Sequence, residues 1–149
     1  MTISQKCQYA IRATFELAKN FGKEPLKISY IAEEQNIPVK FLEAILAELK
    51  EAKFLTSKRG AHGGYTLKTD PAKITVLDII KFIEGPMFFA KCISDEESER
   101  CPQYNACTFL PIWQEAQEAV SKIFKSYNFA QLVANEKENT GSSHDANCL

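Results

Sequence analysis

Apolar residues recur at helical spacing through the front part of the chain. In the first helix they share one face, and Gly22 supplies a stop after it. A second helix is predicted to begin after Ser29, its N-cap, and to end at Asn36, which tolerates the left-handed conformation. Pro38 then opens a third helix. The predicted apolar positions of the first helix are Ala10, Ala13, Thr14, Leu17, Ala18 and Phe21, and those of the third are Phe41, Leu42, Ile45, Leu46 and Leu49.

A basic β-hairpin is predicted directly after these three helices. Residues 54–56 and 65–67 read as paired strands, with SKRGAHGG between them. The three glycines of that connection permit the positive φ angles that a hairpin tip needs. A helix, a helix-turn-helix and a basic hairpin follow one another in this order in winged helix-turn-helix domains.

Two further helices are predicted after the hairpin. Thr75 and Asp78 form a start signal for the first, which Gly85 ends and whose apolar residues are too many for one face. It is therefore expected to be buried on two sides. A long amphipathic helix then spans residues 108–129, and a second copy of the chain is expected to cover it. Its apolar side holds Trp113, Ala116, Val120, Ile123, Phe124 and Tyr127.

The predicted fold class is mainly α, a winged helix-turn-helix DNA-binding domain with a small β-hairpin wing plus a long C-terminal dimerisation helix. The DNA-binding domain is assigned to residues 1–85, a cysteine-bearing cluster loop to 86–107 and the dimerisation helix to 108–134. Residues 135–149 are polar and have no periodic apolar face, so a disordered tail is expected there.

Charge is distributed unevenly along the 149 residues, although the net charge is only −1. Residues 1–70 carry 11 Lys and Arg against 8 Asp and Glu, and residues 71–149 carry 7 against 11. The front half suits a polyanion, although ordinary scatter of surface charge explains such small differences equally well. No segment reads as a membrane span or a signal peptide, so a cytoplasmic protein that does not bind membranes is expected.

Candidate DNA-reading residues lie at the start of the third helix. The second helix of a helix-turn-helix enters the major groove, and its first residues meet base edges. Val39, Lys40 and Glu43 occupy those positions. Lys40 suits a phosphate or a guanine edge, and Glu43 suits the amino group of cytosine. For Glu43 an equally weighted alternative is that it is a solvated surface residue of the helix and contacts no base.

The hairpin tip and the second helix supply further candidates for contacts to DNA. Lys58, Arg59 and His62 stand beside Gly63, where the backbone can approach a phosphate or lie in a minor groove. The alternative is that this positive tip only solubilises the protein. Ser29 and Tyr30 are expected to contact phosphates through hydroxyl and backbone N–H groups.

Three of the five cysteines, Cys92, Cys101 and Cys107, lie in one acidic stretch. In a reducing compartment a clustered, odd set of cysteines favours metal or redox chemistry over disulfides. Thiolates hold iron–sulfur clusters, and a sulfur-rich site also suits zinc or copper(I). Eight residues separate the first pair and five the second, unlike the short spacing of a structural zinc site, so zinc ranks second. Bare thiols remain a third possibility.

Five segments together resemble the IscR, NsrR and CymR group of bacterial winged-helix transcriptional regulators, also called the Rrf-two family. They are YAIRATFELA, ISYIAEEQNIPVKFLEAIL, GAHGGYTL, ITVLDIIKFIEG and the loop with the three cysteines. The resemblance covers about residues 1 to 130. It implies a homodimer that binds imperfect palindromes in double-stranded DNA. It also implies an iron–sulfur cluster on Cys92, Cys101 and Cys107, as many members carry one there and others carry none.

The fourth cluster ligand departs from the patterns of this family. Leu110 stands where relatives of the iron–sulfur-assembly regulator have histidine, and Gln8 stands where nitric-oxide-sensing relatives have aspartate. Cys7 is a ligand by its chemistry, although packing within a helix is the preferred interpretation. Because the fourth ligand is in doubt and the form is common among relatives, the 2Fe–2S cluster is preferred over 4Fe–4S.

The expected function is a dimeric DNA-binding repressor that senses iron–sulfur, redox or nitric oxide status through its cluster. The alternative is a cluster-free regulator of the same fold, controlled by a protein or small-molecule effector or by zinc or thiol redox state. An enzyme is not expected, because the chain has only two histidines and no nucleophile and base at a recognisable spacing.

Overall fold

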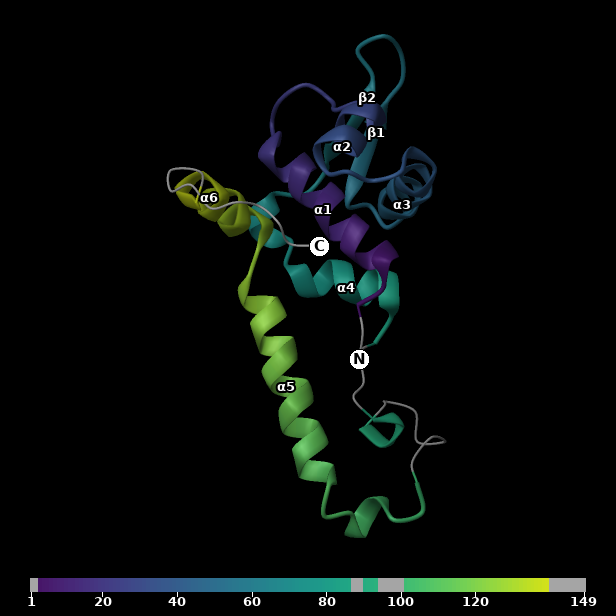
Figure 1. Ribbon diagram of the computed structural model, residues 1–149, viewed down its shortest axis with the longest axis vertical. Helices are drawn as coiled ribbons and strands as arrows, with labels where there is room; N and C mark the ends of the chain where they lie inside the picture. Colours follow the sequence, from purple (N-terminus) through teal and green to yellow (C-terminus); the bar gives the residue numbers. More distant parts are fainter. Residues whose placement is uncertain (1–2, 87–89, 94–100, 140–149) are drawn as a thin grey trace.

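The structure is a computed structural model that describes residues 3–86, 90–93 and 101–139. A winged-helix domain forms one end, and one long helix leads away from it, as Figure 1 shows. Within the described residues no helix combines the length and the apolar character needed to cross a membrane. The predicted architecture, mainly helical with a small two-stranded wing, is confirmed.

Three helices build the front of the domain: α1 (Gln5–Lys19), α2 (Ile28–Glu34) and α3 (Val39–Glu51). The predicted left-handed residue after α2 is confirmed, since Asn36 has φ +50°. The predicted N-cap of α2 is wrong. Lys27 takes the extended N-cap conformation, so the helix starts one residue before Ser29, and no side chain caps it.

The core of the domain lies between α1, α2, α3 and the hairpin. Its largest fully buried side chains include Leu17, Ile31, Leu42, Ile45, Leu46, Leu49, Leu55, Ile79 and Phe129. Two predicted apolar-face residues do not belong to it, because Phe41 is 62% exposed and Phe21 is 42% exposed. Phe41 lies about 100° around α3 from Leu42, and its ring packs beside Tyr9, with ring centroids 6.5 Å apart.

The wing consists of β1 (Leu55–Lys58) and β2 (Gly64–Leu67), which pair antiparallel as predicted. Leu26 extends this pairing, because its backbone exchanges two hydrogen bonds with Tyr65, at 3.0 and 2.8 Å. The chain before α2 is thereby held against the wing. A Cβ on Gly64 would lie 2.2 Å from the Leu26 carbonyl oxygen, so this close approach needs glycine.

A short 3-10 helix, η1 (Pro71–Lys73), leads into α4 (Val76–Glu84). The predicted start signal is confirmed as a capping box. The Asp78 carboxylate accepts from the Thr75 N–H at 2.8 Å, and the Thr75 hydroxyl accepts from the Asp78 N–H at 3.3 Å. Helix α4 packs against α1 and α5, which explains its apolar residues on more than one side.

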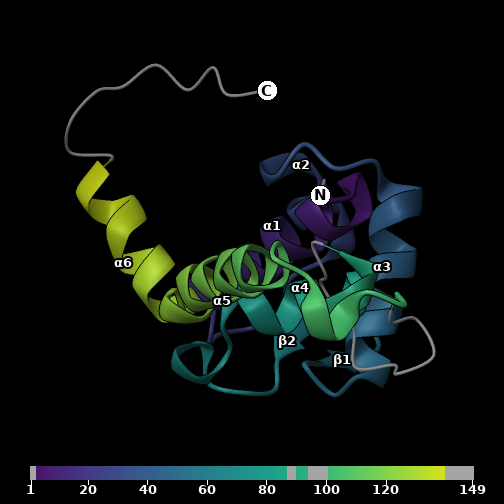
Figure 2. The ribbon, with the colours of Figure 1, turned by 90° about the horizontal axis from the view of Figure 1, so that it is seen from below.

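The long helix predicted over residues 108–129 is present as α5 (Leu110–Ser126), but it does not continue through residue 134, because a separate helix, α6 (Phe129–Asn139), follows it. Asn128 and Gln131 cap α6 reciprocally, with N–H to side-chain distances of 2.8 and 3.1 Å. This second capping box lies within the sequence SYNFAQ, directly after the end of α5. Seen in both Figure 1 and Figure 2, α6 lies on the side of α1 away from α3.

The boundaries predicted for the last segments also change. Residues 135–139, which were assigned to the tail, belong to α6, and residues 140–149 lie outside the described residues. The turn between α5 and α6 is tied to the start of α4. The N–H of Val76 donates to Tyr127 O and that of Phe129 to Ile74 O, both at 3.0 Å.

Candidate nucleic-acid interface and cysteine segment

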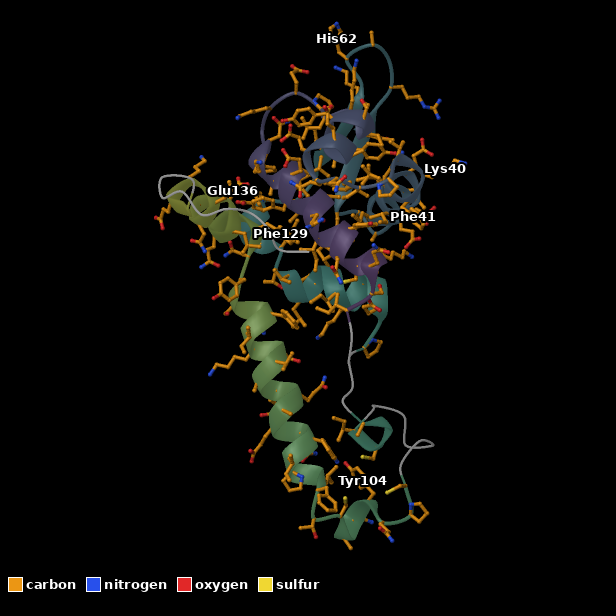
Figure 3. All side chains as sticks on the ribbon, viewed as in Figure 1. Lys40, Phe41, His62, Tyr104, Phe129 and Glu136 are labelled. Atoms are coloured by element: carbon orange, nitrogen blue, oxygen red, sulfur yellow. The ribbon has the colours of Figure 1, made fainter. Side chains whose placement is uncertain are left out.

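The predicted DNA-contacting side chains lie at the wing end of the molecule. Figure 3 places Lys40 on α3 and His62 at the hairpin tip, far from Tyr104 at the other end. Seven of the remaining predicted residues are also described, and six have exposed side chains: Ser29, Tyr30, Val39, Glu43, Lys58 and Arg59. The fold therefore gathers residues from α2, α3 and the wing at one end of the protein.

Gly63 differs from these residues because it is buried within the hairpin. A Cβ at this position would lie 2.3 Å from the Lys58 carbonyl oxygen and 2.8 Å from that of Gly60. The hairpin's own backbone therefore requires a glycine here. A contact between Gly63 and DNA stays a prediction.

A groove of about 660 Å³ separates the wing from the two helices of the helix-turn-helix. Sequence reasoning missed two of its cations, Lys27 and Lys50. Lys50 follows Glu43 by seven residues and so shares its side of α3, which was a usable signal. Lys27 gave no such signal, because only the pairing of Leu26 with the wing brings it there. The lining residues are Lys27, Ile28, Ser29, Lys50, Ser57, Lys58, Arg59, Gly60, Ala61, Gly63, Gly64 and Tyr65.

The groove is positively charged, and no lining residue is acidic. The ion pairs found between described residues all lie elsewhere. Lys6 pairs with Glu48 at 2.8 Å, and Lys19 with Glu16 at 3.2 Å and with Glu136 at 3.4 Å. Within the described chain the lysines and the arginine of the groove thus have no carboxylate within ion-pair distance, which suits them to an external anion.

A buried polar network supports the helix-turn-helix from behind. Glu16 is only 2% exposed and accepts hydrogen bonds from Gln35 Nε2 at 2.7 Å and Lys19 Nζ at 3.2 Å. Gln35 follows α2, so the network holds the turn between α2 and α3 against α1. Partial burial lowers the pKa of Lys19, but Glu16 and Glu136 outweigh this and hold it above its ordinary value. Through Glu136 the network also reaches α6, where Figure 3 shows that residue.

The three loop cysteines lie away from this face, in the segments that precede α5. Cys92 and Cys107 are half-buried, and Cys101 is exposed. The acidic residues between them, Asp95, Glu96, Glu97 and Glu99, lie outside the described residues. Among the described residues no three or more Cys, His, Asp or Glu side chains are placed to hold a metal ion.

The donor set fits an iron–sulfur cluster in kind, since three accessible thiols precede one helix and sulfur is the ligand such clusters use. The described positions of these thiols do not form a ready-made site. The residues that would hold a cluster are therefore identified by their chemistry and not by an assembled geometry.

Cys7 is packed in the interior, as the preferred interpretation predicted. It is fully buried in a small apolar cluster with Leu77 and Ile80, against which Val120 and Phe124 of α5 also pack. Burial, and then the nearby Glu84 carboxylate, raises the pKa of Cys7 to about 12. Since thiolate is the metal-binding form, Cys7 is a poor ligand in this conformation.

Helix α5 has no buried residue within the described structure. Val120 and Phe124 face the Cys7 cluster, but much of the apolar side points outward. Ile112 is 56% exposed and Ile123 57% exposed, and eleven residues, close to three helical turns, place them on one face. Phe109, Trp113 and Tyr127 are exposed as well.

Comparison with known proteins shows strong similarity along nearly the whole described chain. Residues 3–135 match the family model described as "Rrf2: Iron-dependent Transcriptional regulator". The chain is 32% identical to the HTH-type transcriptional regulator CymR of Bacillus subtilis over 134 residues, 90% of this chain and 91% of that protein.

Solved structures agree with the sequence comparison. The structure of CymR (YrzC), the global cysteine regulator of B. subtilis, matches with a TM-score of 0.75 and 31% identity, covering 91% of this chain and 98% of that one. The structure of T. potens IscR matches with a TM-score of 0.73 and 27% identity, covering 98% of this chain and 94% of that one.

Proposed function

The chain belongs to the Rrf2 family of transcriptional regulators, and from this premise we propose that it is a homodimeric repressor whose DNA binding depends on an iron–sulfur cluster. The observation that carries the DNA-binding part is the exposed basic surface of α3, the wing and the groove between them. Within the described residues its cations have no carboxylate partners, and a nucleic acid backbone supplies the missing negative charge.

In this proposal the start of α3 enters the major groove of double-stranded DNA. Lys40 and Glu43, both exposed, reach base edges or phosphates there, and Arg59 on the wing reaches the neighbouring minor groove or backbone. Two copies of the chain related by a two-fold axis read a palindromic operator. Its half-sites are separated by about one helical turn or a multiple of it.

The outward apolar face of α5 supports the dimer. Ile112 and Ile123 stand more than half exposed on that face, and a helix face that exposes several large apolar side chains suits a protein interface. A second copy of the same helix is matched in shape and chemistry and closes with two-fold symmetry. In the dimer these side chains become buried.

The cluster is proposed to bind Cys92, Cys101 and Cys107, with the 2Fe–2S form preferred. Bound there, it would supply a redox-active group that reacts with oxygen or nitric oxide. The protein's part is to hold the cluster and to pass on its state. Helix α5 contacts the cysteine segment at η2 (Lys91–Ile93), packs against α4, and ends at a turn tied to the backbone of the DNA-binding domain.

Iron and acid-labile sulfide counts on protein purified without oxygen test this proposal, together with an absorbance spectrum. We expect iron and sulfide in equal amounts, and their loss when all three cysteines are replaced by serine. The matched control is Cys7→Ala, which removes a buried thiol outside the segment and should leave iron content unchanged. Colourless, iron-free wild-type protein that binds its operator equally well after the triple replacement would exclude the cluster.

A cluster-free regulator of the same fold is the second candidate. One similar structure is that of a protein called a global cysteine regulator, and the described cysteines here do not form an assembled metal site. Such a regulator would respond to a protein or small-molecule effector, or to zinc or thiol redox state. Operator binding that is independent of iron but changes with an effector would favour it.

Arg59→Ala tests the role of the wing. Because a backbone or minor-groove contact from a positive side chain favours all sequences, we expect weaker binding to every duplex and a smaller dependence on salt. Fluorescence anisotropy with labelled duplexes at several salt concentrations measures both. An unchanged affinity and salt slope would remove the wing from the interface.

A further inference from the structure

Lys27 and Lys50 are the two lysines of the groove that have no role in the proposed readout by the start of α3 and the wing tip. Both side chains are exposed, and both line the 660 Å³ groove with Lys58 and Arg59. They come from segments far apart in the sequence, the residue before α2 and the last turn of α3. Only the folded domain brings them to one hollow.

Both lysines are held on fixed elements. Lys50 lies in the last turn of α3, whose neighbour Leu49 is fully buried in the core. Lys27 follows Leu26, whose backbone is hydrogen-bonded on both sides to Tyr65 of the wing. The core and the sheet therefore fix the backbone positions of the two lysines, and their flexible side chains can adjust to a ligand in the groove.

The position of the groove identifies its occupant. Lys50 lies two turns after Glu43 on nearly the same side of α3, about 10 Å further along the helix axis. A duplex whose bases meet the start of α3 thus continues past Lys50 along this side, with the wing on the other wall. The part of DNA that runs beside a reading helix is its sugar–phosphate backbone.

The chemistry of the lining also matches a phosphate backbone better than base edges. Lysine is a flexible point charge that suits phosphate, and the planar groups that are best adapted to bidentate base readout, arginine and the side-chain amides, are represented in the groove only by Arg59. The hydroxyls of Ser29 and Ser57 line the same groove and can donate to phosphate oxygens. No acidic residue lines it.

We propose that Lys27 and Lys50 clamp backbone phosphates of the DNA strand that passes between α3 and the wing, and so set the register of the reading helix. This inference rests on the proposed DNA binding. It adds two positioning residues and a place for the strand. As phosphate contacts, they contribute affinity to every sequence without selecting one.

The test uses the full-length protein and a duplex selected from a random library by the wild type. Binding is measured at several salt concentrations for Lys27→Ala, Lys50→Ala and the double variant. Each lysine occurs twice in a dimer, so each single replacement should make the negative slope of log K against log salt shallower by about two. The ratio of operator to scrambled-duplex affinity should stay within about twofold at fixed salt.

Two controls separate the clamp from general effects of charge and folding. Lys73→Ala removes an exposed lysine from η1, outside the groove, and should leave the slope at its wild-type value. Lys50→Arg keeps the charge and should keep the slope. Thermal unfolding of each variant shows whether the fold is intact.

Neutral methylphosphonate links placed singly along the operator locate the clamp. For the wild type, one position in each half-site should weaken binding most. At that position Lys50→Ala or Lys27→Ala should be insensitive to the modification, because the partner charge is already gone. This coupling is a readout that a purely structural role of the lysines would not produce.

Two results would overturn the inference. One is a wild-type protein that binds DNA with a steep salt slope, while Lys27→Ala and Lys50→Ala match Lys73→Ala in slope and in methylphosphonate sensitivity. The proposed function survives that outcome. The other is tight binding of adenosine monophosphate or inorganic phosphate that depends on both lysines and leaves DNA affinity unaffected, which assigns the groove to a free anion. A wild type that binds no duplex defeats the proposed function itself.

Discussion

Helices α1 and α5 have similar amphipathic patterns but differ in how far their apolar faces are buried. Helix α1 buries seven side chains, from Cys7 to Ala18, whereas α5 buries none among its 17 residues. The cover for α1 comes from α2, α3, α4 and α6 of the same chain. Among the described residues helix α5 packs mainly against α4 along one edge and also contacts η2. An amphipathic pattern therefore predicts which face of a helix will be buried, but not whether the same chain or another molecule buries it.

The largest effect on the free energy of unfolding is expected in the core, where helices of the same chain bury each other's apolar side chains. Phe129 is fully buried in the main core, so Phe129→Ala should lower the free energy of unfolding by about 3–5 kcal/mol. Urea unfolding followed by circular dichroism measures this. Phe41→Ala is the matched control, because Phe41 is 62% exposed, and its loss should be below about 1 kcal/mol. Equal losses at the two positions would contradict the burial that the structure assigns.

The second largest effect is expected on the dissociation constant of the proposed dimer and not on the fold of one chain. Replacing Ile112 and Ile123 by glutamate puts charge on the outward face of α5 and should weaken the proposed dimer at least tenfold, about 1.4 kcal/mol. Analytical ultracentrifugation over a range of concentrations measures the dissociation constant. Glu118→Ala, on the opposite side of the helix, should leave it unchanged. A dimer indifferent to both glutamates would move the interface away from α5.

A smaller effect is expected at the N-terminus of α4. Thr75→Ala removes the hydroxyl that accepts from the Asp78 N–H and should lower the free energy of unfolding by about 1 kcal/mol. Thr75→Ser keeps the hydroxyl and serves as control. Since α4 lies between α1 and α5, hydrogen exchange of its first turn should increase in the alanine variant alone.

The smallest effect at neutral pH concerns Cys7. Its pKa is raised from 9.0 to about 12, so above pH 9 the unfolded thiol loses its proton while the native one keeps it. Stability that is present below pH 9 is therefore lost as pH rises towards 12. Wild-type stability should fall more steeply with pH than that of Cys7→Ala, since other titrating groups are common to both. Parallel curves would show that Cys7 ionises normally.

Reactivity gives an independent check of the same thiol. Exposed Cys101 should be alkylated rapidly by iodoacetamide in the metal-free protein, whereas buried Cys7 should react only after unfolding. Mass spectrometry of peptides at successive times separates the two. Rapid labelling of Cys7 in the native state would show that its cluster with Leu77 and Ile80 opens readily.

Short sequence signals correctly predicted the structures that form within a few neighbouring residues. The Thr75 and Asp78 capping box, the left-handed Asn36 and the glycine-bearing hairpin were all predicted and are present. The equivalent box at Asn128 and Gln131 was not predicted, because apolar residues continue at helical spacing from α5 through Tyr127 and Phe129. Phe41 was misplaced for a related reason. Periodicity alone does not say which edge of an apolar stripe is covered.

The order of helices, the wing, the capping boxes and the thiol-rich segment are determined by the sequence itself, because each depends on residues within one or two helical turns. Only the tertiary structure decided that Lys27 joins Lys50 in one groove and that Phe129 enters the core. Among the described residues it also left the outer face of α5 uncovered. These outcomes depend on packing between segments distant in the chain, where geometry and burial, and not local propensity, set which side chains meet.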